Sequence, residues 1–418
     1  MVAPNAHLDD ELAALHDQTV EFVRNEVTPH GDEWETAGKV PRNVLKSMGG
    51  LGMFGLRVPP EHGGLGLGPL ASLTFSEALG TSTYAGFDVT VLVHTDMALP
   101  HLLNSGSDEQ LERYLPSVLA GDTILSIGVT EPDAGSDVAG IRTRAERDGD
   151  GWRLNGSKIF ITNAVHGDLT IVAARTDPDD RYGISMFLLE KGTQGFSVAR
   201  ALDKTGWRSS DTAELHFDDV WLPDSHLLGT VHRGCDGTMR NFQNERLVLC
   251  GMGVGAAQTA LDITVGYVSD RQAFGEPLWN LGAIRQRLAM QQARVDAARA
   301  SMYHCAWLGE QGHDNVRAVS AAKAWIAEVI NDVMYDCVQF HGGMGYMRET
   351  AVERMSRDAR ILPCGGGATA VVLVEVARRW GAERCASPLV SGRCGSPPPS
   401  GPCGWPGRRA RVPRRGRA

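Results

Sequence analysis

The spacing of hydrophobic residues changes twice along the chain. From residue 8 to about 120, apolar residues such as Leu12 and Leu15 recur at helical intervals, and Pro-Gly loops interrupt the pattern. From Ile124 to about Leu222 the period becomes the alternation that is typical of strands. After Gly234 the helical spacing returns. The pattern predicts a helical unit, then a β unit, then a second helical unit.

This order predicts an α+β fold with four segments. They are an N-terminal helical domain (1–120), a middle β domain (121–232), a C-terminal helical bundle (233–384) and a disordered Pro- and Arg-rich tail (385–418). Because strands and helices do not alternate, a doubly wound nucleotide-binding sheet is disfavoured. Within the β domain, Asn155-Gly156 between Trp152 and Ile159 predicts a tight hairpin.

One glycine-rich segment imitates a dinucleotide fingerprint. Gly251 to Ala256 reads GMGVGA, and Asp270 follows at a tolerable distance. That fingerprint requires a preceding strand, whereas Met239 to Cys250 has a helical pattern. We therefore interpret the small residues as a place where two helices approach closely. A nicotinamide-dependent dehydrogenase remains a remote alternative.

Composition and charge narrow the class of protein. The chain has 418 residues, of which 42% are hydrophobic and 22% charged, so two or three packed globular units are expected. The net charge is −9, but residues 385–418 contain only arginines among their charged residues, which leaves the body more acidic still. This acidity argues against nucleic acid as a partner of the body.

The cysteine pattern and the hydropathy of the chain indicate where in the cell the protein is expected. The eight cysteines form no CxxC pair, so the sequence signals neither a metal site nor a disulfide framework. No uninterrupted apolar stretch approaches the roughly 20 residues that a membrane span needs, and the first thirty residues lack a targeting pattern. We expect a cytoplasmic protein that is not embedded in a membrane.

Two segments carry the most specific signal. Val129 to Asp137 reads VTEPDAGSD, and Asn155 to Asn163 reads NGSKIFITN. The first resembles the signature of the acyl-CoA dehydrogenase family, with Asp133 in place of a glycine, and the second resembles a strand motif of the same family. Further matches follow in the family's order over residues 8 to 382: Asp203–Ser210, Asn244–Val248, Arg271–Gly275, Gln339–Tyr346 and Arg357–Arg360.

The resemblance implies a fold and a reaction. In that family an N-terminal helical domain, a middle β-barrel-like domain and a C-terminal four-helix bundle bind FAD. The enzyme desaturates an acyl-CoA thioester between its α and β carbons to the trans-2-enoyl-CoA, and an electron-transferring flavoprotein accepts the electrons. The helix–sheet–helix order found from periodicity agrees with this fold. A homotetramer, or at least a dimer, is also implied.

The resemblance assigns residues to the cofactor. Thr162 and Thr130 match positions whose side chains donate hydrogen bonds near flavin N5 and the pyrimidine oxygen. Arg271 to Phe274 and Gln339 to Gly343 match positions that hold the pyrophosphate and adenine half across a subunit interface, where glycines allow amides to approach phosphate. The full predicted set is Ile127, Val129, Thr130, Ser136, Phe160, Ile161, Thr162, Arg271, Gln272, Phe274, Gln339, Gly342 and Gly343.

The catalytic base is the main departure from the common pattern. Many family members place a glutamate where this chain has Gly366, in the run Pro363 to Ala368. A minority, which includes the isovaleryl and long-chain branches, carries the base on a helix in the sequence E-R-L. This chain has Glu245 in that sequence, so we predict that Glu245 removes the α-proton, with room left by the glycines at 365–367.

Substrate contacts also follow from the resemblance. The predicted set is Ser136, Gln243, Arg246, Gly366 and Gly367, with the amide of Gly366 donating to the thioester oxygen. Gly282, Ala368 and Ala370 replace polar residues that usually bind the cofactor, which predicts weakened FAD retention.

Two other functions stay open at this level. The same fold could serve as a flavin monooxygenase or oxidase, which needs no base at position 245. It could also serve as a non-catalytic acyl-CoA-binding protein. A base on the helix favours long or β-branched acyl groups, terpenoid acids such as a citronellyl group among them, by family analogy only.

Overall fold

The N-terminal third of the chain is helical. The computed structural model describes residues 7–386, without the side chains of residues 235–240 and 382–386, so nearly all of the predicted tail lies outside the described residues. The helices are α1 (Asp10–Phe22), α2 (Gly31–Ala37), α3 (Arg42–Gly50), α4 (Pro69–Leu79), α5 (Ala85–Leu92), α6 (Leu99–Ser105) and α7 (Asp108–Leu119). Two π-helical turns, η1 (Val23–Val27) and η4 (Val93–Ala98), follow α1 and precede α6.

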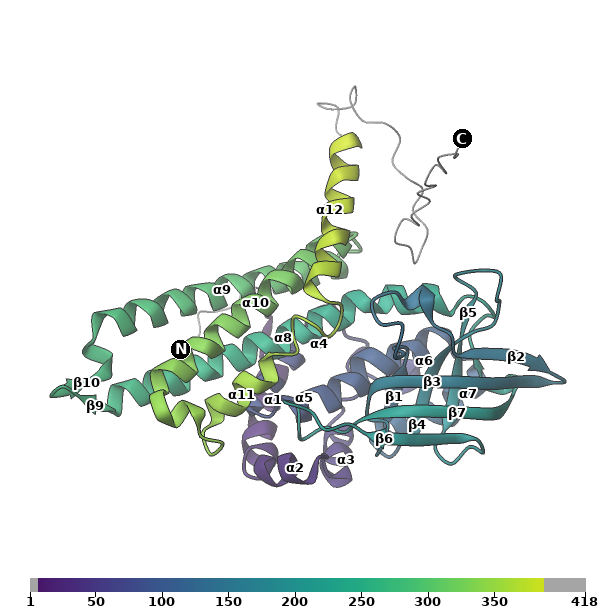
Figure 1. Cartoon of the computed structure of the whole chain (residues 1–418), viewed down its shortest axis with the longest axis horizontal. Coiled ribbons are helices and arrows are strands. Elements are labelled where there is room, and N and C mark those ends of the chain that lie inside the picture. Colours follow the sequence, from purple (N-terminus) through teal and green to yellow (C-terminus); the bar gives the residue numbers. More distant parts are fainter. Residues whose placement is uncertain (1–6, 387–418) are drawn as a thin grey trace, which may run out of the picture.

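A mixed sheet forms the middle of the chain and one end of the molecule (Figure 1). Its strands run in the order β6-β7-β3-β2-β4-β5-β8, and β1 pairs in parallel with β4. They are β1 (Leu125–Gly128), β2 (Arg144–Asp148), β3 (Gly151–Thr162), β4 (Leu169–Arg175), β5 (Ile184–Glu190), β6 (Phe196–Ala201), β7 (Thr212–Pro223) and β8 (Leu227–Leu228).

The predicted hairpin at Asn155-Gly156 was wrong. Strand β3 runs unbroken through both residues, and the tight turn lies instead between β2 and β3, where Gly149 has a φ of 63°. At Gly156, with a φ of 143°, the pairing of β3 with β7 shifts register. A Cβ there would lie 2.7 Å from the Cα of Thr143. The glycine is therefore used for a bulge and a close approach of backbones rather than for a turn.

The last part of the chain is a bundle of long helices. It consists of α8 (Gly234–Asp270), α9 (Gly282–Glu310), α10 (Val316–His341), α11 (Ala351–Ala359) and α12 (Thr369–Ala386), with a small ribbon of β9 (Gln272–Ala273) and β10 (Glu276–Pro277) between α8 and α9. In Figure 1 the ribbon lies at the end of the bundle opposite the sheet, and α12 rises away from the bundle. The α+β class and the helix–sheet–helix order are thus confirmed.

Helix α8 is the axis around which the other helices pack, because glycines let it approach them closely. A Cβ on Gly251 would lie 2.1 Å from Ser76 Oγ, and one on Gly255 would lie 2.0 Å from the carbonyl oxygen of Glu77, both on α4. On Gly253 it would meet Ile330 of α10 at 2.3 Å. The interpretation of this segment as a close helix contact is confirmed.

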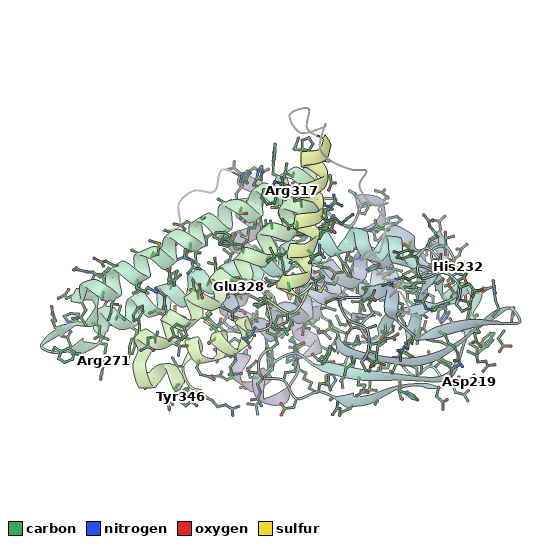
Figure 2. All side chains as sticks on the ribbon, turned by 45° about the horizontal axis from the view of Figure 1, so that its top comes forward. Asp219, His232, Arg271, Arg317, Glu328 and Tyr346 are labelled. Atoms are coloured by element: carbon green, nitrogen blue, oxygen red, sulfur yellow. The ribbon has the colours of Figure 1, made fainter. Side chains whose placement is uncertain are left out.

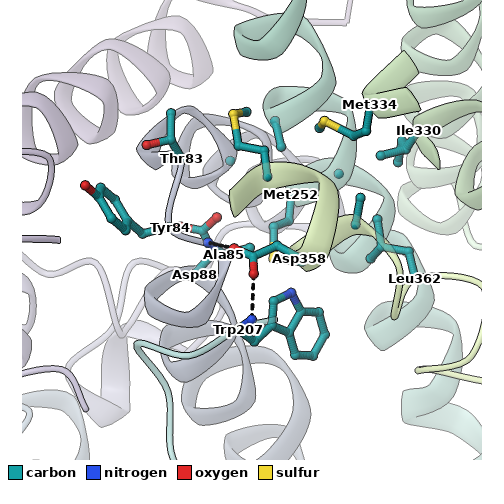
Figure 3. Close-up of a pocket in the computed structure, with 15 residues that line it drawn as sticks. Thr83, Tyr84, Ala85, Asp88, Trp207, Met252, Ile330, Met334, Asp358 and Leu362 are labelled. Atoms are coloured by element: carbon teal, nitrogen blue, oxygen red, sulfur yellow. Dashed lines mark hydrogen bonds between the residues drawn. The ribbon is translucent and has the colours of Figure 1, made fainter. Parts of the chain in front are cut away.

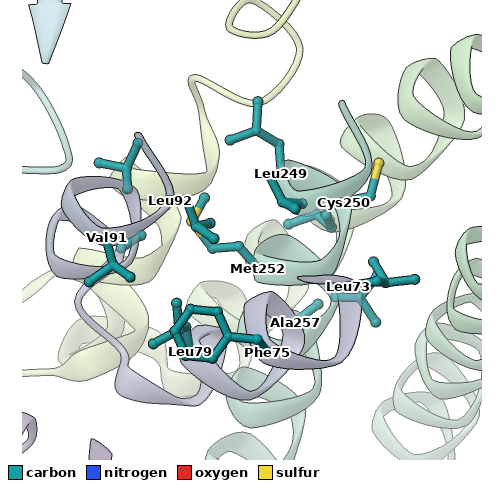
Figure 4. Packing of buried hydrophobic residues seen from close by; sticks show 14 of the residues in the cluster. Leu73, Phe75, Leu79, Val91, Leu92, Leu249, Cys250, Met252 and Ala257 are labelled. Atoms are coloured by element: carbon teal, nitrogen blue, oxygen red, sulfur yellow. The ribbon is translucent and has the colours of Figure 1, made fainter. Parts of the chain in front are cut away.

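The N-terminal helices and the bundle share one hydrophobic core. Figure 4 shows side chains of α4, α5 and α8 packed together, among them Phe75, Leu92 and Met252. Residues Asn241–Asp270 of α8 are long and apolar enough to cross a membrane by length and composition, but 67% of the apolar window is buried inside the fold. Buried core helices pass the same test, and α8 has the packing of such a helix.

Candidate active site

The predicted base lies on the first part of α8. Glu245 is partly buried, and its Oε1 accepts a hydrogen bond of 3.0 Å from Asn241 Nδ2, one turn earlier on the helix. Burial raises the pKa of Glu245 to about 7, against the lowering effects of that hydrogen bond and of Arg246. A carboxyl group with a pKa near 7 can exchange a proton at physiological pH, as a general base must.

The glycine loop between α11 and α12 faces the same side of α8. Gly366 and Gly367 have φ values of 63° and 100°, which glycine adopts without strain. A Cβ on Gly366 would lie 2.5 Å from Leu249 Cδ1, and Leu249 is one turn beyond Glu245. The structure therefore brings Gly366 to the face of α8 that carries the predicted base.

Two cations hold this loop through its carbonyl groups. Arg246 Nε donates to the Gly366 oxygen at 3.4 Å, and the Lys323 ammonium donates to the Gly367 oxygen. Both side chains are buried, and burial lowers the pKa of Lys323 to about 8. Among the described residues the Gly366 amide donates to no backbone acceptor. Arg246 and Lys323 thus anchor the loop by its oxygens, and the Gly366 amide takes no part in that anchoring.

Arg246 is committed to the protein interior. Its Nη1 donates to Ser320 Oγ at 3.2 Å and to Gln243 Oε1 at 3.4 Å, in addition to the bond to Gly366. The structure therefore shows Arg246 and Gln243 as supports of the loop, while their predicted contacts with substrate stay a prediction. Sequence comparison alone gave Lys323 no role, although a lysine on the apolar face of a helix is an unusual enough feature to be noticed.

The two signature segments lie side by side. The amide of Ile159 donates to the Thr130 oxygen at 2.9 Å, and Lys158 Nζ donates to the Val129 oxygen at 3.0 Å. Lys158 also forms a buried ion pair of 2.7 Å with Glu131. These contacts bring together the predicted flavin-ring residues of the two segments: Ile127, Val129, Thr130, Phe160, Ile161 and Thr162.

Glu131 and Lys158 were missed as site residues. The Glu131 carboxylate also accepts from the amides of Arg142 and Thr143, at 2.6 and 2.9 Å. Burial would raise the pKa of Glu131, but the charge and hydrogen bond of Lys158 and the amides outweigh it and lower that pKa. Glu131 therefore stays ionised and pins the loop after β1 to β3. Both residues stand inside the signature motifs, which was the available signal.

An uncovered aromatic ring marks this part of the sheet. Phe160 is 66% exposed and has a φ of 62°, a left-handed conformation that is strained for an aromatic residue. Thr162 is only partly exposed, two residues further on the same strand. A flat apolar face beside hydroxyl donors fits the ring of a flavin. Ser136, predicted to contact both cofactor and substrate, lies exposed in the loop after β1.

The other predicted cofactor residues lie at the opposite end of the molecule. Figure 2 shows Arg271 and Tyr346 at the tip of the bundle, far from Asp219 at the end of the sheet. Tyr267 OH donates to the His341 oxygen at 3.3 Å, so the ends of α8 and α10 lie together. The residues concerned are all exposed: Arg271, Gln272, Phe274, Gln339, Gly342 and Gly343. One chain therefore does not bring the two groups together.

A buried carboxyl group links the sheet to the bundle. Asp358 of α11 accepts from the amides of Trp207 at 2.6 Å and of Ala85 at 3.2 Å (Figure 3). Burial, reinforced by nearby Glu35, raises its pKa to about 7. Its bonds run to backbone amides in the Asp203–Ser210 segment and at the start of α5. Through Asp358, the motif Arg357–Arg360 therefore holds α11 against the Asp203–Ser210 segment and the start of α5.

The fold and this geometry place the chain among flavin-dependent oxidoreductases. Butyryl-CoA dehydrogenase from Megasphaera elsdenii superposes with a TM-score of 0.86 at 30% identity, over 90% of this chain and 100% of that protein. That protein is named for its activity on an acyl-CoA thioester. The superposition therefore supports the fold and the class of reaction together.

Family models and relatives name the family. Models for the N-terminal, middle and C-terminal domains of acyl-CoA dehydrogenases match residues 9–122, 126–220 and 232–381. The long-chain specific acyl-CoA dehydrogenase of Sus scrofa is 40% identical over 85% of this chain and 83% of its own length. The isovaleryl-CoA dehydrogenase of Pongo abelii is 32% identical over 90% of both. The chain belongs to the acyl-CoA dehydrogenase family, and its cofactor is FAD.

Proposed function

We propose that Glu245 is the base of an FAD-dependent α,β-dehydrogenation of an acyl-CoA thioester. The observation that carries the proposal is the position of Glu245 on α8, one turn from Leu249, which packs against Gly366. Glu245 takes the α-proton, and the electron pair of the broken α-C–H bond forms the new double bond. The bound FAD supplies the hydride acceptor for the β-hydrogen. The product is the trans-2-enoyl-CoA.

The Gly365–Gly367 loop supplies the other part of the chemistry. As the α-proton leaves, negative charge develops on the thioester oxygen, and a donor held in place before the reaction stabilises it. The Gly366 amide is such a donor, because Arg246 and Lys323 fix the next two carbonyl groups of the loop, those of Gly366 and Gly367. The two cations thereby also prevent the loop from turning its oxygens toward the developing charge.

We also propose that the active unit contains more than one copy of this chain. The ring of FAD would lie against β1 and β3 of one copy, and its pyrophosphate and adenine against the bundle tip of another. The exposed Phe274, Tyr346 and Met344 at that tip, at 93%, 82% and 42% exposure, support such a contact. A homotetramer or dimer, an electron-transferring flavoprotein as acceptor and a cytoplasmic location complete the proposal.

For the substrate we propose a long or β-branched acyl group. The support is the position of the base on α8, together with relatives named for long-chain and isovaleryl substrates.

The decisive experiment compares wild type with Glu245→Gln. FAD-loaded protein is titrated without oxygen with straight and branched acyl-CoAs while the visible flavin band is followed. We expect wild type to bleach and the variant to bleach at least about 10³-fold more slowly, the usual range for a lost general base. Glu112→Gln, an exposed glutamate on α7, is the matched control and should behave as wild type.

Other outcomes point to the other functions. Equal bleaching of Glu245→Gln and wild type would remove Glu245 from the mechanism. Rapid reoxidation of bleached wild type by dioxygen would favour an oxidase or monooxygenase. Binding of acyl-CoA without any bleaching would favour a non-catalytic binding protein.

A further inference from the structure

A change of hydrogen-bond pattern where η4 meets α6 leaves a carbonyl group without the donor of a regular α-helix. The π-helical turn η4 ends at Ala98, and Pro100 stands at the second position of α6. In a regular helix the N–H of residue 100 would bond to the oxygen of Asp96, but proline has no N–H. A buried carbonyl group needs another donor, and Asp96 is only 3% exposed.

Two asparagines of α8 supply that donor. Asn241 Nδ2 lies 3.0 Å from the Asp96 oxygen and 3.1 Å from the Met97 oxygen, and Asn244 Nδ2 lies 3.1 Å from the same Asp96 oxygen. Asn241 Nδ2 is also the donor to Glu245 Oε1, at 3.0 Å. The two backbone oxygens can only accept, so the nitrogen of the Asn241 amide must face them.

We propose that Asn241 is a positioning residue for the base, tying one oxygen of Glu245 to the fixed backbone at Asp96 and Met97. This inference rests on the proposed role of Glu245. The bond occupies Oε1, and Oε2 has no donor among the described residues, so it is left to receive the α-proton. The amide also stabilises the anionic form of the carboxylate, which is the form that acts as base.

Asn244 is a natural control, because it joins α8 to the segment at Asp96 as Asn241 does but does not contact the base. It donates to the same Asp96 oxygen and to Asp96 Oδ1 at 3.2 Å, and its own oxygen accepts from Arg57 at 2.7 Å. It makes no bond to Glu245. The charged groups near the base are Arg246 on α8, Asp96 on η4 and Arg57, which is bound through Asn244. Replacing either asparagine by leucine removes none of these three charges.

The test replaces each asparagine by leucine, which has a similar size and donates nothing. In Asn241→Leu we expect bleaching at saturating substrate to slow by about 10- to 100-fold and the acid limb of its pH profile to move upward by about one unit. The substrate Kd should stay within about twofold. Asn244→Leu should change neither rate nor profile by more than about twofold. Asn241→Asp, which adds a like charge, should move the acid limb further upward.

FAD content and thermal unfolding show whether each variant is folded. If Asn241→Leu does not fold, Asn241→Asp takes its place in the test. Equal slowing in both leucine variants with an unmoved acid limb would overturn the proposal, since Asn241 would then only join helices. An unchanged Asn241→Leu would overturn it as well. If Glu245→Gln retains full bleaching, the proposed base has failed and the inference fails with it. If Glu245→Gln is inactive and Asn241→Leu is not, the inference alone has failed.

Discussion

The two halves of the predicted flavin site are built in opposite ways. The half on β1 and β3 is cross-linked by a buried ion pair and backbone bonds, so its exposed Phe160 stands on a rigid support. The half at the bundle tip is made of exposed side chains, and Arg271 has no side-chain partner among the described residues. The difference teaches that contacts within the chain fix one half, whereas the other half is left exposed, as the proposed assembly of more than one copy requires.

Breaking the rigid half should have the largest effect. Lys158→Met leaves the Glu131 carboxylate buried without its cation, so we expect a loss of about 3–5 kcal/mol in the free energy of unfolding. Denaturant unfolding measures this loss. Lys46→Met, which breaks an exposed ion pair of 2.6 Å with Asp122, should cost less than about 1 kcal/mol. Equal costs would show that the buried pair is no special support.

Breaking the exposed half should leave the folded chain intact. In Arg271→Ala we expect FAD to bind about 10- to 100-fold more weakly, because a charge-assisted hydrogen bond to the pyrophosphate is lost. The midpoint of unfolding of the FAD-free protein should not change, since the side chain is exposed. Flavin titration measures the affinity, and denaturant unfolding measures the midpoint. Unchanged FAD affinity would contradict a site shared between copies.

The smallest expected effect concerns the stability cost of the base. Burial raises the pKa of Glu245 from 4.5 to about 7, so between these values the folded protein holds a proton that the unfolded chain has released. Stability therefore falls as the pH rises through this window. Glu245→Gln should be more stable than wild type by about 1–2 kcal/mol at pH 8, and by much less at pH 5. No difference between the two pH values would argue against a buried, proton-holding Glu245.

Much of the fold could be predicted from local pattern. Periodicity distinguished the helices from the strands. The helical pattern of Met239–Cys250 correctly predicted that Gly251–Ala256 is a close contact between helices and not a nucleotide-binding motif. Asn155-Gly156 misled because a bulge and a hairpin use the same residues for the same left-handed or open conformations. What decides between them is the backbone of Thr143, which lies against Gly156 in the fold, and the local pattern around Asn155-Gly156 does not reveal this contact.

The site could be predicted only as far as its motifs reach. Glu245 stood out because Gly366 lacks the usual carboxylate, a comparison that needs no structure. Asn241 could not be found in the same way. Its importance depends on a missing N–H at Pro100, about 140 positions away in sequence, and on a π-helical turn that periodicity does not reveal.

The three glycines at 251, 253 and 255 have a consequence for how the chain tolerates change. Each of them leaves no space for even a methyl group against α4 or α10. A side chain at any one of them would have to push α8 away from its neighbours. Glu245 and Asn241 lie on the same helix, so they would move with it. Positions two to three turns from the chemistry should therefore accept as little variation as the base itself.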